Sequence, residues 1–283
     1  MVALRFLTIL STLLRPSAAL ARSTVLELAI LTGHVLLYPT GLTQERRPPS
    51  PPVPPSGPTD TPGLTTKATK VGEHPPVLLL HGFIDNRSVF VLLRRSLRRN
   101  GWRQVESLNY SPLTCDVRTA AELLGRHVED FCARTGSRRV DVVGHSLGGL
   151  IARYYVQRLG GDARVRTLVT LGTPHGGTRV APLMSAHPLV RQMRPGSEVI
   201  RELAAPAPNC GTHFIGFWSD LDQLMVPVET ARIDHPDLIA RNVRVTGVGH
   251  LALPVHWAVA TGIRQALTTE EPAADASGTA SVA

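Results

Sequence analysis

The chain has 283 residues, of which 43% are apolar, and its formal net charge is +8. This length fits one large domain or two small ones, and the apolar content supports a sizeable core. The positive charge is nearly all arginine, and no basic stretch alternates with aromatic residues, so we expect no nucleic-acid partner. The three cysteines and the histidines lack the spacing of metal ligands, so we predict structural cysteines and no metal.

Residues 1–44 are expected to form a signal peptide or a membrane-anchor segment. Arg5 precedes an apolar run over residues 6–14, and Ala19-Leu-Ala21 has the small-x-small pattern of a cleavage site. A second apolar stretch, over residues 24–38, is shorter than the ~20 residues that a membrane-spanning helix needs. We therefore expect a secreted or membrane-associated protein that meets a membrane surface. The alternative is an N-terminal helix that packs on the following domain.

A proline-rich stretch separates this leader from the rest of the chain. Most of its prolines lie between residues 48 and 58, and such a segment packs no core but behaves as an extended spacer. We predict a linker over residues 45–72 and a globular domain over residues 73–268. The tail, residues 269–283, is rich in small and polar residues, and we expect it to be disordered.

Apolar runs and helical spacings alternate along the globular domain. The runs predict strands, and apolar residues at intervals of three and four predict helices. Strands are expected at 77–81, 104–108, 140–143, 165–171, 213–218 and 243–246, and helices at 88–99, 117–133, 147–159 and 255–267. This alternation predicts an α/β fold, with a mostly parallel central sheet and helices on both faces. In such sheets, ligands bind at the carboxyl ends of the strands.

The segment Gly144-His-Ser146-Leu-Gly148 joins a predicted buried strand to a predicted helix. A Gly-x-Ser-x-Gly turn in this context is a nucleophile elbow, which lifts the serine hydroxyl out of the sheet. The two glycines permit the tight turn because a Cβ would crowd it. The helix that follows directs backbone N–H groups and its positive dipole end toward the reacting atoms. We therefore predict that Ser146 is a nucleophile for acyl transfer.

Candidate partners for Ser146 follow other strands in the order serine, aspartate, histidine. His250 follows a late strand and is the expected general base, which takes the serine proton and returns it to the leaving group. Asp222 and Asp220 both follow the 213–218 strand, and we favour Asp222 as the carboxylate that orients the imidazole. The backbone N–H groups of Phe83 and Leu147 are the expected oxyanion hole.

Other histidine-containing motifs have different interpretations. His81 is expected to shape the turn that presents Phe83, His145 to pack within the elbow, and His175 is a candidate pocket residue. Residues 247–252 match a G-x-G-x-x-A dinucleotide pattern, but that pattern needs a βαβ unit and an acidic residue ~20 positions later. Only one predicted helix follows, so the glycines are assigned to the loop that carries the last histidine.

The stretch over residues 177–211 lies between two predicted strands and mixes apolar residues with prolines and arginines. We expect it to form short helices that make a small cap or lid over Ser146 and shape an acyl pocket. The alternative is simple packing of a crossover connection.

The domain resembles the bacterial lipase/esterase group of α/β-hydrolases, particularly actinobacterial secreted lipases. The resemblance covers about residues 75–268. Its most specific motifs are Pro76-Val-Leu-Leu-Leu-His-Gly-Phe83, Val143-Gly-His-Ser-Leu-Gly-Gly-Leu-Ile-Ala152, Leu171-Gly-Thr-Pro-His-Gly-Gly177 and Gly247-Val-Gly-His-Leu251. It implies an eight-strand-type sheet, carboxylic-ester substrates and no cofactor. It also favours Asp222, because the acid of this group precedes an apolar step.

These observations predict a serine carboxylic-ester hydrolase that acts on triacylglycerol or other lipid esters through Ser146, Asp222 and His250. The same triad would serve an acyltransferase, in which an alcohol replaces water, or a deacylase of lipid-linked inositol. A hydrolase fold without activity, used as a lipid-binding module, is the alternative from a different class. The residues do not decide acyl length, natural substrate or oligomeric state.

Overall fold

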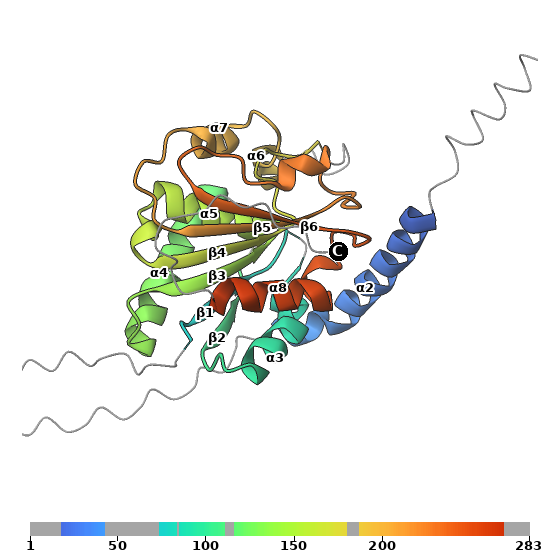
Figure 1. Cartoon of the computed structure of the whole chain (residues 1–283), viewed down its shortest axis with the longest axis horizontal. Coiled ribbons are helices and arrows are strands. Elements are labelled where there is room, and N and C mark those ends of the chain that lie inside the picture. Colours follow the sequence, from blue (N-terminus) through green and yellow to red (C-terminus); the bar gives the residue numbers. More distant parts are fainter. Residues whose placement is uncertain (1–17, 43–73, 84, 111–115, 180–186, 269–283) are drawn as a thin grey trace, which may run out of the picture.

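The computed structural model describes residues 18–42, 74–83, 85–110, 116–179 and 187–268. A single parallel sheet of six strands lies at the centre of this part of the chain, in the order β2-β1-β3-β4-β5-β6 (Figure 1). The strands are β1 (Val77–Leu80), β2 (Val105–Leu108), β3 (Val140–His145), β4 (Val165–Leu171), β5 (His213–Ser219) and β6 (Ile239–Val245). Every adjacent pair is parallel, so all six carboxyl ends lie at one edge.

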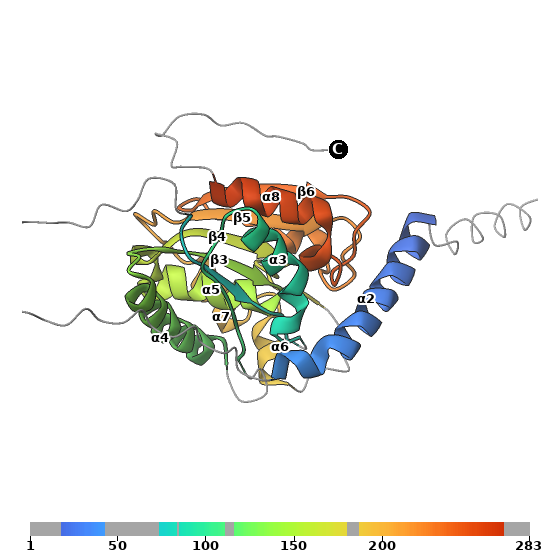
Figure 2. The same cartoon turned by 90° about the horizontal axis from the view of Figure 1, so that it is seen from below.

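Helices cover both faces of the sheet. The helices α3 (Val91–Arg99) and α8 (Trp257–Thr268) lie on one face, and α4 (Val117–Thr135) and α5 (Leu147–Arg158) lie on the other (Figure 2). Alternate residues of β1 divide between the two cores, with Leu78 and Leu80 in one and Val77 and Leu79 in the other. A strand buried on both faces therefore reads as a continuous apolar run.

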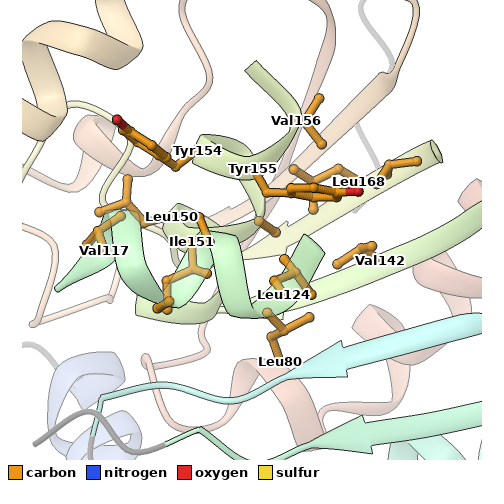
Figure 3. Packing of buried hydrophobic residues seen from close by; sticks show 14 of the residues in the cluster. Leu80, Val117, Leu124, Val142, Leu150, Ile151, Tyr154, Tyr155, Val156 and Leu168 are labelled. Atoms are coloured by element: carbon orange, nitrogen blue, oxygen red, sulfur yellow. The ribbon is translucent and has the colours of Figure 1, made fainter. Parts of the chain in front are cut away.

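The larger core lies between α4, α5 and the sheet (Figure 3). Leu124 from α4, Ile151 from α5 and Val142 from β3 meet there, and each is at most 2% exposed. Full burial of one such side chain contributes about 1.5–3 kcal/mol. This packing holds α5 rigidly against β3, so it fixes the strand-to-helix turn that carries Ser146.

The predicted alternation of strands and helices over a mostly parallel sheet is confirmed. The largest shift is in β6, which was predicted over 243–246 and begins at Ile239. Among the described strands it pairs only with β5 and is one of the two edge strands, and its first residues are exposed and lack an apolar run. The resemblance implied an eight-strand-type sheet, whereas the described residues form six strands.

The segment between β4 and β5 forms two short helices, α6 (Pro188–Gln192) and α7 (Glu198–Ala204), while residues 180–186 lie outside the described part. The predicted short helices are therefore present. Val199 and Leu203 of α7 are fully buried and belong to the same core as α5. Arg153 of α5 also donates to the carbonyl oxygen of Leu203, so α7 is fixed to the domain.

The N-terminal helix α2 (Ala18–Leu42) runs along one side of the domain, beside α3 (Figures 1 and 2). The first part of the predicted leader, the predicted linker, the predicted tail and Cys115 lie outside the described residues. Cys132 and Cys210 are free thiols. Among the helices that the structure describes, none combines the length and the apolar character needed to cross a membrane.

Candidate active site

Ser146 lies at the turn between β3 and α5, as the sequence predicts for the elbow residue. Its φ angle is 52°, in the left-handed region that non-glycine residues rarely adopt. A Cβ on Gly148 would lie 2.5 Å from the carbonyl oxygens of Leu80 and His81, so only glycine fits at that crossing with β1. The backbone N–H of Ser146 donates to the carbonyl oxygen of Leu171 over 2.9 Å, which fixes the strained turn to β4.

His250 and Asp222 form a buried pair near the elbow. The Nδ1 atom of His250 lies 2.8 Å from Oδ2 of Asp222, and His250 is only 3% exposed. The other carboxylate oxygen, Oδ1, accepts hydrogen bonds from the backbone N–H groups of Leu224 and Met225. With Nδ1 held in this way, Nε2 is the ring nitrogen available to a reacting group.

Asp220 has a different neighbour, although it stands only two residues from Asp222. It pairs with Arg244 of β6 over 3.0 Å, and its side chain is 30% exposed. Asp222 is 1% exposed and faces His250. The loop therefore directs the first aspartate to the solvent-facing edge strand and the second into the site.

Ser219, at the end of β5, joins the aspartate loop to the histidine loop. Its hydroxyl donates to the carbonyl oxygen of Val248 and accepts from the backbone N–H of Leu221. The side chain is fully buried. Sequence reasoning missed this contact, because a serine at a strand end has no pattern that reveals a partner 29 residues away.

His145, directly before Ser146, packs against His250. The two ring centroids are 4.8 Å apart, and Nε2 of His145 lies 3.2 Å from the carbonyl oxygen of His250. Nδ1 of His145 lies 3.4 Å from the carboxylate of Asp85, which is largely buried. The elbow histidine thus packs within the turn, as expected, and its neighbour Asp85 is a polar residue of the site that sequence reasoning missed.

His81 shapes the turn before Phe83. It is buried, stacks on the ring of Tyr110 with 4.3 Å between centroids, and accepts at its carbonyl oxygen from the Tyr110 hydroxyl. Phe83 lies against His187, which begins the cap helix α6, with 4.8 Å between ring centroids. Phe83 lines the same pocket as Ser146, whereas Leu147 is fully buried as the first residue of α5.

A pocket opens at the carboxyl edge of the sheet, and about 720 Å³ of space lies within it and its solvent-open mouth. Ser146, His250, His145 and Asp85 provide most of its polar side chains. Its other lining residues are mainly apolar and include Phe83, Val190, Met193, Leu224, Met225 and Leu251. Val190 comes from α6 and Met193 follows it, so the cap forms part of the wall, as predicted.

The charges around His250 favour its protonated form. Burial opposes the charge, but the carboxylates of Asp222, Glu27 and Asp85 outweigh burial and raise the pKa of His250 above its ordinary value. The neighbouring His145 shows the reverse, because burial and the proximity of His250 outweigh Asp85 and lower its pKa. The pKa values of the two adjacent imidazoles are therefore shifted in opposite directions.

His175 was expected as a pocket residue, but the pocket lining does not include it. Its ring is buried and lies 2.9 Å from the Thr170 hydroxyl and 3.2 Å from a guanidinium nitrogen of Arg153. Burial, with the nearby guanidinium, holds the pKa of His175 well below its ordinary value. The ring braces α5 against the loop after β4, and the preceding Pro174 lines the pocket in its place.

A family model described as palmitoyl protein thioesterase matches residues 76–225, more than half of the chain. The chain belongs to this family. The match begins just before β1 and ends at Met225, so it includes the elbow and the aspartate loop but stops before the histidine loop. The sequence pointed to lipases and esterases and did not single out this family.

Curated relatives that match part of the chain are triacylglycerol lipases. A triacylglycerol lipase of Vibrio cholerae is 31% identical over 134 residues, which are 46% of this chain and 40% of the relative. A triacylglycerol lipase of Burkholderia plantarii is 29% identical over 129 residues, which are 43% of this chain and 35% of that relative. The chain thus matches less than half the length of these relatives.

Solved structures show the fold. The mature form of the Bacillus licheniformis lipase BlEst2 superposes with a TM-score of 0.60 at 16% identity, over 70% of this chain and 94% of that one. Aspergillus fumigatus lipase B superposes with a TM-score of 0.63 at 18% identity, over 72% of this chain and 54% of that one. The predicted α/β-hydrolase fold of the lipase/esterase type is confirmed. These likenesses do not single out an actinobacterial type.

Proposed function

We propose that this protein is a serine ester hydrolase that cleaves lipid esters through Ser146, His250 and Asp222. The observation that carries the proposal is the buried 2.8 Å contact between Asp222 and His250, beside a serine on a strained elbow in an apolar pocket. A nucleophile, a base and an orienting carboxylate in this arrangement suit acyl transfer.

In the proposed reaction, His250 takes the Ser146 proton as the hydroxyl oxygen attacks the ester carbonyl carbon. The tetrahedral intermediate collapses to an acyl-enzyme, and the imidazolium gives its proton to the leaving alcohol. Water then attacks the acyl-enzyme with His250 again as base, which releases the acid and restores Ser146. Asp222 stabilises the imidazolium in both steps. The N–H groups of Phe83 and Leu147 would stabilise the oxyanion, each by about 3 kcal/mol.

The apolar wall of the pocket supports an acyl chain as the part of the substrate that binds there. Met193 and Met225 are unbranched, flexible side chains that adapt to a hydrocarbon chain, and Leu224 adds apolar surface beside them. The likeness to triacylglycerol lipases also favours lipid esters. We therefore propose esters of medium or long acyl chains over short, polar esters.

The test uses the full-length chain with p-nitrophenyl esters from acetate to palmitate. Expected are Ser146-dependent hydrolysis and a higher kcat/KM for the longer chains. Ser146→Ala should abolish turnover, while Ser137→Ala, in the loop before β3, serves as the matched serine control and should not. Equal turnover by wild type and Ser146→Ala would exclude Ser146 as the nucleophile.

A thioester is the second candidate substrate, because the family model is named for palmitoyl protein thioesterases. The same acyl-enzyme would form with a thiolate as the leaving group. Hydrolysis of palmitoyl-coenzyme A and of p-nitrophenyl palmitate by the same preparation compares the two directly. A higher kcat/KM for the thioester would make thioester hydrolysis the principal activity.

We also propose that the protein works at a membrane surface. Val25, Leu28, Val35 and Leu36 are each 58–73% exposed, and their spacing puts them on one face of α2. Leu251, which lines the pocket, is held by Glu27 on the opposite side of this helix, so the helix that carries the apolar face packs beside the pocket. Flotation with vesicles of phosphatidylcholine and phosphatidylglycerol tests the proposal. Val35→Ser with Leu36→Ser should reduce the bound fraction, and unchanged flotation would refute a role for this face.

A further inference from the structure

Helix α2 contacts three loops of the candidate active site, although the sequence predicted a leader for this region. The face opposite its exposed apolar residues carries Glu27 and His34, which lie seven residues apart and therefore on one side of the helix. Glu27 reaches the histidine loop after β6, and His34 reaches the loop after β1. The helix thus spans from one loop to the other.

The Glu27 carboxylate binds the chain directly after His250. One oxygen accepts from the backbone N–H of Leu251 over 2.8 Å, and the other accepts from the N–H of Ala252 over 2.9 Å. A Cβ on Gly249 would lie 2.4 Å from the carboxyl carbon of Glu27, so a side chain at position 249 would displace the carboxylate from this contact. Both carboxylate oxygens of Glu27 therefore accept hydrogen bonds from this loop, and Gly249 leaves room for the carboxylate.

Contacts along the rest of the helix fix its position. Nδ1 of His34 lies 3.5 Å from Asp85, and the side-chain amide of Asn86 donates to the carbonyl oxygen of Tyr38 over 2.8 Å. Near the start of the helix, Gln223, the residue after Asp222, donates to the Thr24 hydroxyl over 3.2 Å. These bonds tie α2 to three loops of the site.

We propose that Glu27 is a positioning residue for His250 and that α2 is an integral part of the active site. This inference rests on the proposed function of Ser146, Asp222 and His250. Glu27 acts through the backbone of Leu251 and Ala252. By holding this backbone, it keeps the imidazole of His250 in position to contact Asp222. A cleavage after Ala21, as the sequence suggested, would leave Glu27 in the mature chain.

The carboxylate also acts through its charge. Four titratable groups face His250 from the elements packed around it: Asp222 after β5, Asp85 after β1, His145 at the end of β3 and Glu27 on α2. Glu27 contributes to raising the pKa of His250, so it stabilises the imidazolium that forms during proton transfer. Removal of this charge should lower the pKa of His250 and weaken transition-state stabilisation.

The experiment compares full-length wild type, Glu27→Gln and Glu27→Asp, with Glu122→Gln as the matched control at an exposed position on α4. The probe is p-nitrophenyl butyrate, or the best ester of the series. For Glu27→Gln we expect kcat to fall about tenfold with little change in KM. The acid limb of its kcat/KM profile should move to lower pH. Glu27→Asp keeps the charge and should retain an acid limb closer to that of wild type.

Hydrogen exchange gives a readout that does not need activity. The amides of Leu251 and Ala252 should exchange faster in Glu27→Gln than in wild type or Glu122→Gln, while the amides of β3 should be unchanged. Faster exchange throughout the domain would mean general unfolding and would overturn the positioning role. Unchanged kcat, pH profile and local exchange would also overturn it. If the wild type has no esterase activity but Glu27→Gln still speeds exchange at Leu251 and Ala252, the proposed function and the positioning role are both refuted. The hydrogen bonds from these two amides to Glu27 would still be supported.

Discussion

Two buried aspartate–histidine pairs surround Ser146, and they differ in what the histidine nitrogens contact. In one, Asp222 holds Nδ1 of His250 at 2.8 Å and leaves Nε2 available. In the other, Nδ1 of His145 lies 3.4 Å from Asp85, while Nε2 faces the carbonyl oxygen of His250 at 3.2 Å. Both nitrogens of His145 therefore face protein atoms, and only His250 is placed to exchange a proton with a substrate.

The comparison shows that residue type and burial alone do not make a catalytic pair. Both histidines are at most 3% exposed and both have a carboxylate neighbour. They differ because the charges of three carboxylates outweigh burial at His250, whereas burial dominates at His145. The first shift helps His250 to hold the proton that it takes during acyl transfer, and the second disfavours protonation of His145.

The largest expected difference is between the two histidines. His250→Gln should reduce kcat about a million-fold, because the general base is lost in both steps. His145→Gln should reduce kcat far less and should mainly lower the melting temperature, since it removes ring packing and a contact with the His250 backbone. Steady-state kinetics and thermal unfolding of both variants check this. A greater loss of kcat in His145→Gln would reverse the assignment.

The next largest effect concerns Asp222. Asp222→Asn should reduce kcat about 1,000- to 10,000-fold, because the amide does not enforce the correct imidazole tautomer. Wild-type kcat/KM should fall as pH drops through the raised pKa of His250, because the protonated imidazole is not a base. Any residual activity of Asp222→Asn should have its acid limb at lower pH, since the carboxylate no longer favours the imidazolium. If the acid limb of Asp222→Asn stayed at the pH of the wild-type limb, a group other than His250 would be responsible for it.

A smaller effect is expected for Asp85, and it should appear in stability. Burial opposes its charge, but His145 and His34 outweigh burial and lower the pKa of Asp85 below 3.8. Asp85→Asn should therefore reduce the free energy of unfolding by about 1–3 kcal/mol at pH 7. The difference in the free energy of unfolding between wild type and Asp85→Asn should shrink as pH falls from about 4. The reason is that Asp85 takes up a proton at a higher pH in the unfolded chain than in the folded protein. Urea unfolding at several pH values measures it, and a constant difference would contradict it.

The smallest effect is expected at the surface. Asp220 pairs with Arg244, whose side chain is 58% exposed, and such pairs contribute about 0–1 kcal/mol. Asp220→Asn should change kcat less than twofold and stability by less than about 1 kcal/mol. It is the matched control for Asp222→Asn, because the two aspartates share a loop. A large loss of activity in Asp220→Asn would exchange their proposed roles.

The sequence alone determined the sheet, the elbow and the order of the candidate triad. These features are local, because a buried parallel strand is a continuous apolar run and a sharp turn needs glycine. Ser146 follows such a strand and His250 follows the predicted strand 243–246, so their position at the carboxyl edge of the sheet could be predicted. The start of β6 was misjudged most, because the edge of the sheet allows polar residues such as Arg241.

Only the tertiary structure decided which groups meet. Asp220 and Asp222 are both acids just after one strand, and the loop geometry alone sends the second to His250. Asp85 near His145 and Glu27 at Leu251 come from segments 60 and 224 residues away. No local pattern encodes such contacts, because they depend on how loops and the N-terminal helix pack around the finished sheet. The physical reason is that a buried carboxylate must be satisfied by hydrogen-bond donors or opposite charges. The fold brings these partners from distant segments, so the residues next to the carboxylate in the chain do not reveal them.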